Sequence, residues 1–295
     1  NKKIIVIGDV YLDEYIYTEG QRNSPEAPIP RAVVKSRKHQ PGSAGNIAMG
    51  FRELGADVKV IGVIGDDEPG KILKKKLDEK GINTNFLVAD KERVTGIFTR
   101  ILLNGREIKN HIIRIDTENK ERLSAETKNR IFSFLEKEIP KSDAVFIADY
   151  DETKGTGIID EKTVEEITKI SGKNKAKTIG ISRMNINYLK NLDVVIMNKE
   201  EAEAVANAKI EDENALKKAG NIIKNKINNK ILIISLGKGG LFALDKYQQI
   251  RLPSFAKKVV DVCGAGETLS RTFVLSILSG ASVEAACRNG SIASA

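Results

Sequence analysis

A glycine-rich stretch late in the chain, Asp261–Thr268, combines residues that could handle a charged group. Gly264 and Gly266 allow a tight turn that exposes backbone N–H groups, and an apolar helical pattern follows them. The N–H groups of this turn, including that of Ala265, and the positive end of the helix would stabilise negative charge on a phosphoryl group in transfer. Glu267 is placed to accept a proton from an attacking hydroxyl. An ordinary turn before an acidic helix start is the alternative interpretation.

A second glycine-rich stretch, Pro41–Asn46, lies far upstream and opens an amphipathic helical pattern. The small residues Gly42 and Gly45 allow a sugar to approach the backbone closely. The amide of Asn46 can both donate and accept hydrogen bonds, as recognition of sugar hydroxyls requires. Taken alone, the stretch is also explained as a loop that starts a helix.

Short runs rich in β-branched residues alternate with helical patterns along most of the chain. The predicted strands are Ile4–Ile7, Val58–Ile64, Ala144–Ala148, Thr178–Ile181, Val194–Met197 and Ile231–Ser235. The predicted helices are Ala44–Leu54, Gly70–Lys80, Ala125–Glu138, Lys162–Ser171, Lys199–Ala206 and Glu213–Asn225. This alternation predicts an α/β fold with a mostly parallel sheet flanked by helices on both faces. Ligands bind beyond the carboxyl ends of the strands in such sheets, so residues that follow each strand are candidates for the site.

Two segments interrupt the alternation and predict a small second sheet. The first holds several prolines followed by an alternating stretch, and the second holds two strand-like runs around Asn104 and Gly105. An Asn-Gly pair is typical of a hairpin turn. We expect antiparallel lid strands from about 14–38 and 94–116, projecting over the ligand edge of one domain that spans 1–295.

The charge pattern does not favour a nucleic-acid partner. The net charge is +8, but the lysines are interleaved with Asp, Glu and Asn in helical stretches. The chain has no Trp, and its other aromatic residues do not alternate with basic ones. We interpret the lysines as a solvated surface whose mildly positive field also attracts anionic substrates.

The remaining composition indicates a cytoplasmic enzyme rather than a secreted or metal-stapled domain. The two cysteines, Cys263 and Cys287, have no metal-ligand spacing and are too few for a disulfide scaffold. The two histidines, His39 and His111, are too isolated to indicate a zinc site. The apolar run Ile4–Ile7 is too short for a signal-peptide core, and no stretch approaches the ~20 apolar residues of a membrane span.

The two glycine-rich stretches, in this order and roughly 220 residues apart, resemble the paired motifs of the ribokinase-like (PfkB) carbohydrate kinases. The resemblance covers essentially the whole chain and implies a ribokinase-like fold. Within that family, the segments Ile7–Tyr15, Asn23–Pro28 and Pro41–Asn46 look like those of bacterial D-glycero-β-D-manno-heptose 7-phosphate kinases. The resemblance also implies a homodimer that forms through the lid strands.

The resemblance assigns residues to the sugar side of a site. Asp13 matches an aspartate that binds sugar hydroxyls, and Arg114 and Asp116 match a lid segment that reaches the phosphosugar. The full implied set is Asp9, Asp13, Gly42, Gly45, Asn46, Arg114 and Asp116. Asp13 could instead cap a turn, and Arg114 and Asp116 could instead be a cross-strand pair.

The resemblance likewise assigns residues to the nucleotide side, with ATP and Mg²⁺ as the implied cofactors. Asn198 and Glu201 match an Asn-x-x-Glu motif that organises magnesium, through water, and the phosphates. The loop under the phosphates is matched by Ser235, Gly237 and Gly240, the anion hole by Gly264, Ala265 and Gly266, and the general base by Glu267. Asn198 could instead cap a helix, and Glu201 could be a solvated helix acid.

Several residues depart from the family pattern near the site. Glu267 stands where the family places an aspartate, and its extra methylene moves the carboxylate by over ~1 Å. Arg271 stands where small residues are usual, Ile147–Gly155 is two residues longer before its Lys-Gly, and Ser182–Met184 replaces Asp-Pro-Lys. Family members also continue beyond the position of Ala295 with a segment that helps to enclose the adenine.

Two hypotheses follow from the motifs and the departures. The first is an ATP-dependent phosphotransferase that acts on a sugar or sugar phosphate similar to heptose 7-phosphate, with Glu267 as base. The second is a catalytically weak or inactive relative that binds nucleotide or sugar phosphate as a regulatory or assembly partner.

Overall fold

The computed structural model describes residues 1–21, 23–26, 28–29, 31–104, 109–151, 153, 155–256 and 264–295. Within these residues, nine strands form a main sheet in the order β13-β12-β11-β10-β9-β8-β1-β4-β5. Its strands are β1 (Lys3–Gly8), β4 (Asp57–Gly65), β5 (Asn83–Asp90), β8 (Ala144–Asp149), β9 (Lys177–Ser182), β10 (Val194–Asn198), β11 (Ile231–Ser235), β12 (Leu241–Leu244) and β13 (Gln249–Leu252). Neighbours pair in parallel from β5 to β11, and β12 and β13 are antiparallel additions at one edge.

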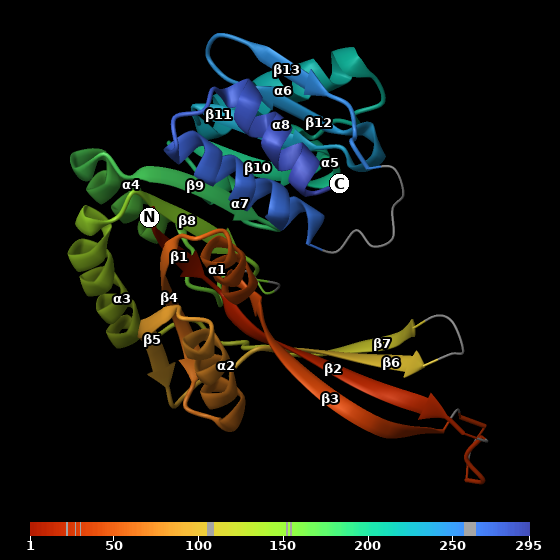
Figure 1. Cartoon of the computed structure of the whole chain (residues 1–295). Helices are drawn as coiled ribbons and strands as arrows, with labels where there is room; N and C mark the ends of the chain where they lie inside the picture. The colour runs from red at the N-terminus through yellow and green to blue at the C-terminus, as the bar shows by residue number, and fades with distance from the viewer. Residues whose placement is uncertain are drawn as a thin grey trace.

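Helices cover both faces of this sheet, as predicted (Figure 1). They are α1 (Ala44–Glu53), α2 (Glu68–Glu79), α3 (Ala125–Glu138), α4 (Glu161–Asn174), α5 (Lys199–Ala206), α6 (Glu213–Ile227), α7 (Ala265–Leu278) and α8 (Val283–Ala293). Short 3-10 turns occur at Ile139–Lys141, Ile186–Tyr188 and Gly237–Gly239. The six predicted strands and six predicted helices are all confirmed, with boundaries that differ by a few residues.

Alternate side chains of each central strand enter two separate apolar cores. Ile4 and Val6 of β1 pack with helices α1, α2, α7 and α8, and Ile5 and Ile7 pack with α3 to α6. Each fully buried side chain of this size stabilises the fold by about 1.5–3 kcal/mol. The doubly covered sheet explains why its central strands are continuous apolar runs.

A smaller sheet leaves the main one and extends away from it (Figure 1). Its order is β3-β2-β6-β7, with β2 (Val10–Gly20), β3 (Ala32–Ser43), β6 (Ile97–Asn104) and β7 (Lys109–Thr117). A second sheet from these segments was predicted, and its role as a lid stays a prediction. One correction concerns the pairing: the two outer pairs are antiparallel, but β2 and β6 pair in parallel. Two chain segments far apart in sequence therefore meet side by side rather than as one meander. Gly105 of the predicted hairpin turn lies outside the described residues.

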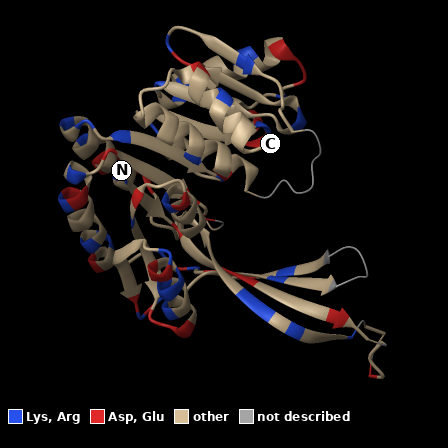
Figure 2. Cartoon of the chain, in the orientation of Figure 1, with Lys and Arg blue, Asp and Glu red and all other residues tan. Residues whose placement is uncertain are grey.

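The charged side chains are distributed rather than gathered. Figure 2 shows Lys and Arg interspersed with Asp and Glu along the helices, with further basic residues on β3.

Among the described residues, no helix has the length and apolar character needed to cross a membrane.

Candidate active site

The carboxyl ends of the parallel strands meet the start of α7 around one cavity of about 850 Å³. Its walls include the ends of β8, β9, β10 and β11 and the first turn of α7. Sequence-predicted residues in its lining are Asn198, Glu201, Ser235, Gly237, Gly240, Gly264, Ala265, Gly266 and Glu267. The nucleotide-side and catalytic candidates are therefore brought together. The sugar-side candidates do not line this cavity: Asp9 lies between β1 and β2, Arg114 and Asp116 lie on β7, and the others lie on β2, β3 and α1.

The helix α7 begins directly after a glycine in a left-handed backbone conformation. Gly264 precedes the helix at φ 79°, in the left-handed region that favours glycine. Within the described part of the chain no side chain caps this helix, so its first N–H groups lack that source of hydrogen-bond acceptors. An added Cβ at Gly266 would meet nothing within 4 Å, which leaves the backbone open to the cavity. Residues 261–263 of the motif lie outside the described residues.

The carboxylate of Glu267 lies between the sugar-side loop and the end of β8. The amide Nδ2 of Asn46 donates to Glu267 Oε2, and the hydroxyl of Tyr150 donates to Oε1 at 2.6 Å. Glu267 is half-buried and lines the cavity. The two glycine-rich stretches are separated by more than two hundred residues, and each thus contributes one predicted residue, Asn46 or Glu267, to this contact.

Tyr150 connects this carboxylate to a second one. Its backbone N–H donates to Asp9 Oδ2 at 3.1 Å, while its hydroxyl donates to Glu267. Burial, and then the negative charge of Glu267, raise the pKa of the Tyr150 hydroxyl well above its usual value. The phenol is therefore protonated and acts as a donor. The guanidinium of Arg183 lies over its ring at 5.0 Å from the centroid.

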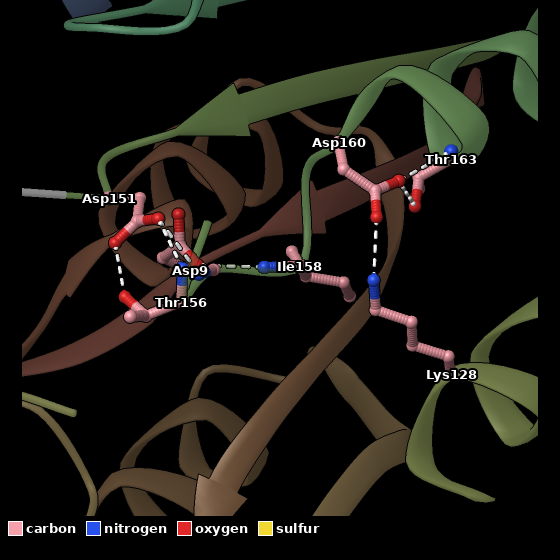
Figure 3. Close-up of polar contacts among 8 residues, drawn as sticks. Asp9, Lys128, Asp151, Thr156, Ile158, Asp160 and Thr163 are labelled. Carbon is pink, nitrogen blue, oxygen red and sulfur yellow. Dashed lines mark hydrogen bonds and ion pairs between the residues drawn. The ribbon is translucent and has the colours of Figure 1, made fainter. Parts of the chain in front are cut away.

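Asp9 lies after β1 among other acids, under the loop that follows β8. Its Oδ1 accepts a hydrogen bond from the N–H of Ile158 at 3.3 Å (Figure 3). Burial, and then the nearby carboxylates of Asp149 and Asp151, raise the pKa of Asp9 to about 7. Asp9 is thus held mainly by backbone donors, and its predicted contact with sugar stays a prediction.

The lengthened loop after β8 is folded around one aspartate. Asp151 accepts from the N–H groups of Thr153, Thr156 and Gly157 at 2.8–3.2 Å, and from the Thr156 hydroxyl at 2.7 Å (Figure 3). Glu152 and Lys154 of this loop lie outside the described residues. The segment 182–184, which also departs from the family pattern, is likewise held by an aspartate at its first residue. The hydroxyl of Ser182 donates to Asp149 at 2.5 Å.

The sugar-side loop fits closely around Asp13. A Cβ added to Gly42 would lie 2.9 Å from Cγ of Asp13, so only glycine leaves room for this carboxylate. Arg100 donates to Asp13 Oδ1 at 2.9 Å. Ser43 has φ 51°, an unfavourable backbone conformation of the kind that clusters at functional sites. Gly45 is the next residue but one, in the first turn of α1, where a Cβ would meet Pro41 at 2.9 Å.

Arg114 and Asp116 lie on β7 of the lid and bind each other. Nε of Arg114 donates to Asp116 Oδ1 at 2.7 Å, and the guanidinium lies 4.0 Å from the ring centroid of Phe98. The pair belongs to one strand, so the alternative of a cross-strand pair is wrong. The structure places these residues away from the cavity lining, and their role in sugar binding stays a prediction.

Asn198 and Glu201 form a reciprocal cap at the start of α5. Asn198 Oδ1 accepts from the N–H of Glu201 at 2.7 Å, and Glu201 Oε2 accepts from the N–H of Asn198 at 2.8 Å. Burial raises the pKa of Glu201, which a bound cation would oppose by favouring the ionised form. A magnesium ion that keeps several waters fits these two oxygen-bearing side chains at the cavity wall. The described residues include no cluster of three or more potential ligands.

The loop after β11 turns through two glycines on the cavity wall. Gly237 and Gly240 have φ of 55° and 88°, both in the left-handed region. A Cβ at Gly240 would lie 2.2 Å from the carbonyl oxygen of Leu252, so this glycine is required by packing. A Cβ at Gly237 would meet nothing within 4 Å, which leaves open space where phosphates could lie.

Three residues that contact Glu267 or its neighbours had no predicted role, namely Tyr150, Arg183 and Arg271. Tyr150 follows the predicted strand Ala144–Ala148 by two residues, and that position after a strand was the available signal. The contacts of Arg183 and Arg271 join segments that are distant in sequence, and no local pattern encodes them. Each contact depends on the assembled fold.

The doubly wound sheet, the lid, and a carboxylate at the start of a glycine-led helix together define a sugar kinase of ribokinase-like fold. The chain belongs to the pfkB family of carbohydrate kinases, and the sequence profile of that family matches residues 1–295. It is 32% identical over 296 residues to the bifunctional protein HldE of Helicobacter pylori (strain J99), covering 100% of this chain and 62% of that protein. It is 32% identical to HldE of Desulfatibacillum aliphaticivorans, covering 96% of this chain and 57% of that protein. The chain thus spans about three fifths of these relatives.

Solved structures show the same fold at lower sequence identity. The tetrameric inhibited form of phosphofructokinase-2 from Escherichia coli superimposes with a TM-score of 0.79 at 18% identity, covering 100% of this chain and 93% of that one. Ribokinase from Arabidopsis thaliana, complexed with ribose and ATP, gives a TM-score of 0.74 at 18% identity, covering 99% and 91%. At this identity the likeness establishes the ribokinase-like fold.

Proposed function

We propose that this protein transfers the γ-phosphoryl group of ATP to a hydroxyl of a sugar or sugar phosphate similar to heptose 7-phosphate. The observation that carries the proposal is the position of Glu267. Its carboxylate lies on the cavity wall at the start of α7 and accepts a hydrogen bond from Asn46 of the sugar-side loop. A hydroxyl bound beside Asn46 would thus be next to both a proton acceptor and an anion site.

The chain's own groups divide the reaction between them. Asp13 and Asn46 orient the acceptor, and the hydroxyl oxygen forms a bond to the γ-phosphorus as the bond to the ADP oxygen breaks. The hydroxyl proton passes to Glu267, and the N–H groups at the start of α7 stabilise the charge on the transferring group. Bound near Asn198 and Glu201, Mg²⁺ would neutralise charge on the nucleotide phosphates.

The proposed sugar specificity is supported by the resemblance of Ile7–Tyr15, Asn23–Pro28 and Pro41–Asn46 to the heptose 7-phosphate kinases. The HldE proteins are bifunctional, and this chain matches one part of them. The test is ADP release with heptose 7-phosphate, fructose 6-phosphate and ribose as acceptors, compared with a no-sugar control. Turnover with heptose 7-phosphate above the other two supports the proposal. Turnover at background with all three sugars contradicts it.

A second candidate is a weak or inactive relative that binds these ligands without efficient transfer. One observation favours it: both carboxylate oxygens of Glu267 already accept a hydrogen bond from the protein. The variant Glu267→Asp separates the two candidates. A strong rise in turnover would mean that the longer side chain had misplaced the base, and a fall would mean that the site is adapted to glutamate.

We further propose that two copies of the chain pair through their lid sheets. Val33 and Val34 of β3 and Ile113 and Ile115 of β7 are exposed apolar residues on that sheet. Burial of such a surface against a second copy would remove it from water. Light scattering should show a dimer that Ile113→Lys converts to monomer. The same change at exposed Ile222 on α6 should leave the dimer intact, and a monomeric wild-type chain would contradict this assignment.

A further inference from the structure

Arg271 joins the helix of the base to the helix of the sugar-side loop. It lies one helical turn after Glu267 on α7, and its guanidinium is directed at α1. Nη1 donates to the backbone carbonyl of Asn46 at 3.1 Å, and Nη2 donates to the hydroxyl of Thr268 at 3.0 Å. The two helices lie side by side there (Figure 1). Arg271 thus holds the main chain of the residue whose side chain binds Glu267.

The guanidinium occupies a space that α1 leaves open at Gly50. A Cβ built on Gly50 would lie 2.0 Å from Nη1 and 2.1 Å from Cζ of Arg271, far inside contact distance. A glycine inside a helix costs about 1 kcal/mol relative to alanine. The glycine at position 50, although unfavourable in a helix, therefore leaves the room that the guanidinium of Arg271 occupies on the facing helix.

The electrostatics of the contact also favour a specific role. Burial lowers the pKa of the Arg271 guanidinium, and the negative charges of Glu267 and then Glu53 oppose that effect. Its Nε is buried without a hydrogen-bond partner in the described part of the chain. Burying a cation with an unmet donor is unfavourable, and an apolar side chain would fill the same space without that cost.

We propose that Arg271 is a positioning residue for Glu267, which acts by clamping Asn46 against α7 through the notch at Gly50. The inference rests on the proposed role of Glu267 as the base. A glutamate has one more rotatable bond than an aspartate, so its carboxylate needs more constraint to keep one position. Asn46 contacts both Glu267 and Arg271, which lie one helical turn apart on α7, and these two contacts supply the constraint.

The first test removes the clamp and follows kcat and the KM for ATP separately. Arg271→Ala is expected to lower kcat about 10- to 100-fold, the scale of a ~1 Å misplacement of a reacting group. The KM for ATP should change less than about twofold, because among the described residues the guanidinium of Arg271 donates to Asn46 and Thr268 and not to the loop of Ser235, Gly237 and Gly240. Arg271→Lys keeps the charge but presents its donors from a single nitrogen rather than from the planar fork of a guanidinium, so it should recover only part of kcat.

The second test uses Gly50→Ala, which alters no residue of the cavity lining. The added methyl should displace the guanidinium and reproduce the kcat loss of Arg271→Ala. In the Arg271→Ala background the three atoms nearest to this methyl are gone, so the double variant should lose no more kcat than either single variant. Losses that multiply, or an unchanged kcat in Gly50→Ala, would overturn the proposal.

A matched control is available at Gly172 in α4. This glycine is also helical, and an added Cβ would meet nothing within 4 Å. Gly172→Ala should therefore raise Tm by about 1–2 °C and leave kcat unchanged, as expected for a helical glycine without a partner. Gly50→Ala should instead lower Tm, and should raise it once Arg271 is alanine.

The thermal measurements keep this inference separate from the proposed function. If wild-type protein shows no turnover with any sugar, the role of Glu267 as base fails, and with it the positioning role. The reversal of the Gly50→Ala shift in Tm between the two backgrounds would still establish the clamp between α1 and α7. The wild type could be active while Gly50→Ala shifts Tm equally in both backgrounds and the kcat losses of the two single variants multiply in the double variant. In that case the clamp fails and the proposed function stands.

Discussion

Two carboxylates are tied to opposite ends of Tyr150, and they are held in different ways. Asp9 accepts from the backbone N–H of Tyr150 and from that of Ile158, beside two further aspartates. Glu267 accepts from the Tyr150 hydroxyl and from the Asn46 amide, and it attracts the guanidinium of Arg271. One carboxylate is fixed by main chain, and the other is fixed by side chains from three separate elements.

The difference separates a residue that shapes a loop from one that is presented to a ligand. Backbone donors to Asp9 fix the path of the chain after β8, and any change there alters the fold of the loop. The side-chain donors to Glu267 can exchange for a substrate hydroxyl without moving the main chain. A carboxylate with replaceable partners, at the wall of a cavity, is suited to proton transfer.

The largest expected effect follows from removing the charge of Glu267. Glu267→Gln keeps the shape and can still contact Tyr150, but it cannot accept the hydroxyl proton. We expect kcat to fall about 10²- to 10⁴-fold, the usual contribution of a general base. The exposed Glu284 on α8 provides a control in Glu284→Gln, which should keep wild-type kcat in the same ADP-release assay. An active Glu267→Gln enzyme would remove this residue from the mechanism.

The next effect concerns Asp9 and the dependence of stability on pH. Its pKa is about 7 in the folded protein, against a model-peptide value of 3.8. Between these values the folded state keeps a proton that the unfolded chain has lost, so the free energy of unfolding decreases as pH rises from 4 to 7. We expect Tm to fall by about 5 °C over this range through Asp9.

Asp9→Asn tests this assignment by removing the titrating group. The Tm of this variant should depend less on pH. It should also be lower at pH 5, because the two backbone N–H groups bond to different oxygens of Asp9 and one of those oxygens becomes the NH₂ group of Asn. The exposed Asp57 serves as control, since Asp57→Asn should retain the wild-type slope. Equal slopes for wild type and Asp9→Asn would show that another group titrates.

A smaller effect is expected when the link between the two carboxylates is cut on one side. Tyr150→Phe removes the hydroxyl that donates to Glu267 and leaves the backbone N–H that donates to Asp9. A hydrogen bond to a charged group contributes about 1.5–3 kcal/mol, so kcat should fall about tenfold or somewhat more. The pH dependence of Tm should be unchanged. An effect on both quantities would mean that the two carboxylates form one coupled unit.

Most of the fold was predictable from sequence, because a sheet covered on both faces requires apolar runs that are visible locally. The strands that were missed explain the limit: β5 has polar residues at its start, and β12 and β13 lie at an antiparallel edge. The pairing of β2 with β6 in parallel joins segments some eighty residues apart, and neither segment encodes its partner.

The candidate site was predictable to the extent that its residues carry motifs. Glu267 and Asn46 belong to glycine-rich stretches, and the structure brings them into contact. Arg271 was visible as a departure from the family pattern, but its fit against Gly50 was not, because a helical glycine is a common residue and nothing in the sequence pairs the two. Their relation arises only when α1 and α7 pack together.

The smallest expected effect extends the comparison to Asn198, which is both a helix cap and a proposed ligand-binding residue. Replacing an Asn cap by alanine costs about 0.5–2 kcal/mol, so Asn198→Ala should lower Tm by a few degrees. Asp212 caps α6 in the same way, by accepting from the N–H of Ala215 at 2.7 Å, and it does not line the cavity. Asp212→Ala should therefore lower Tm by a similar amount and leave the KM for ATP unchanged. If Asn198 also organises the metal and phosphates, its variant alone should raise that KM, by about three- to tenfold. Equal KM values in the two variants would assign Asn198 to the cap and leave the phosphates to the glycine loop and the start of α7.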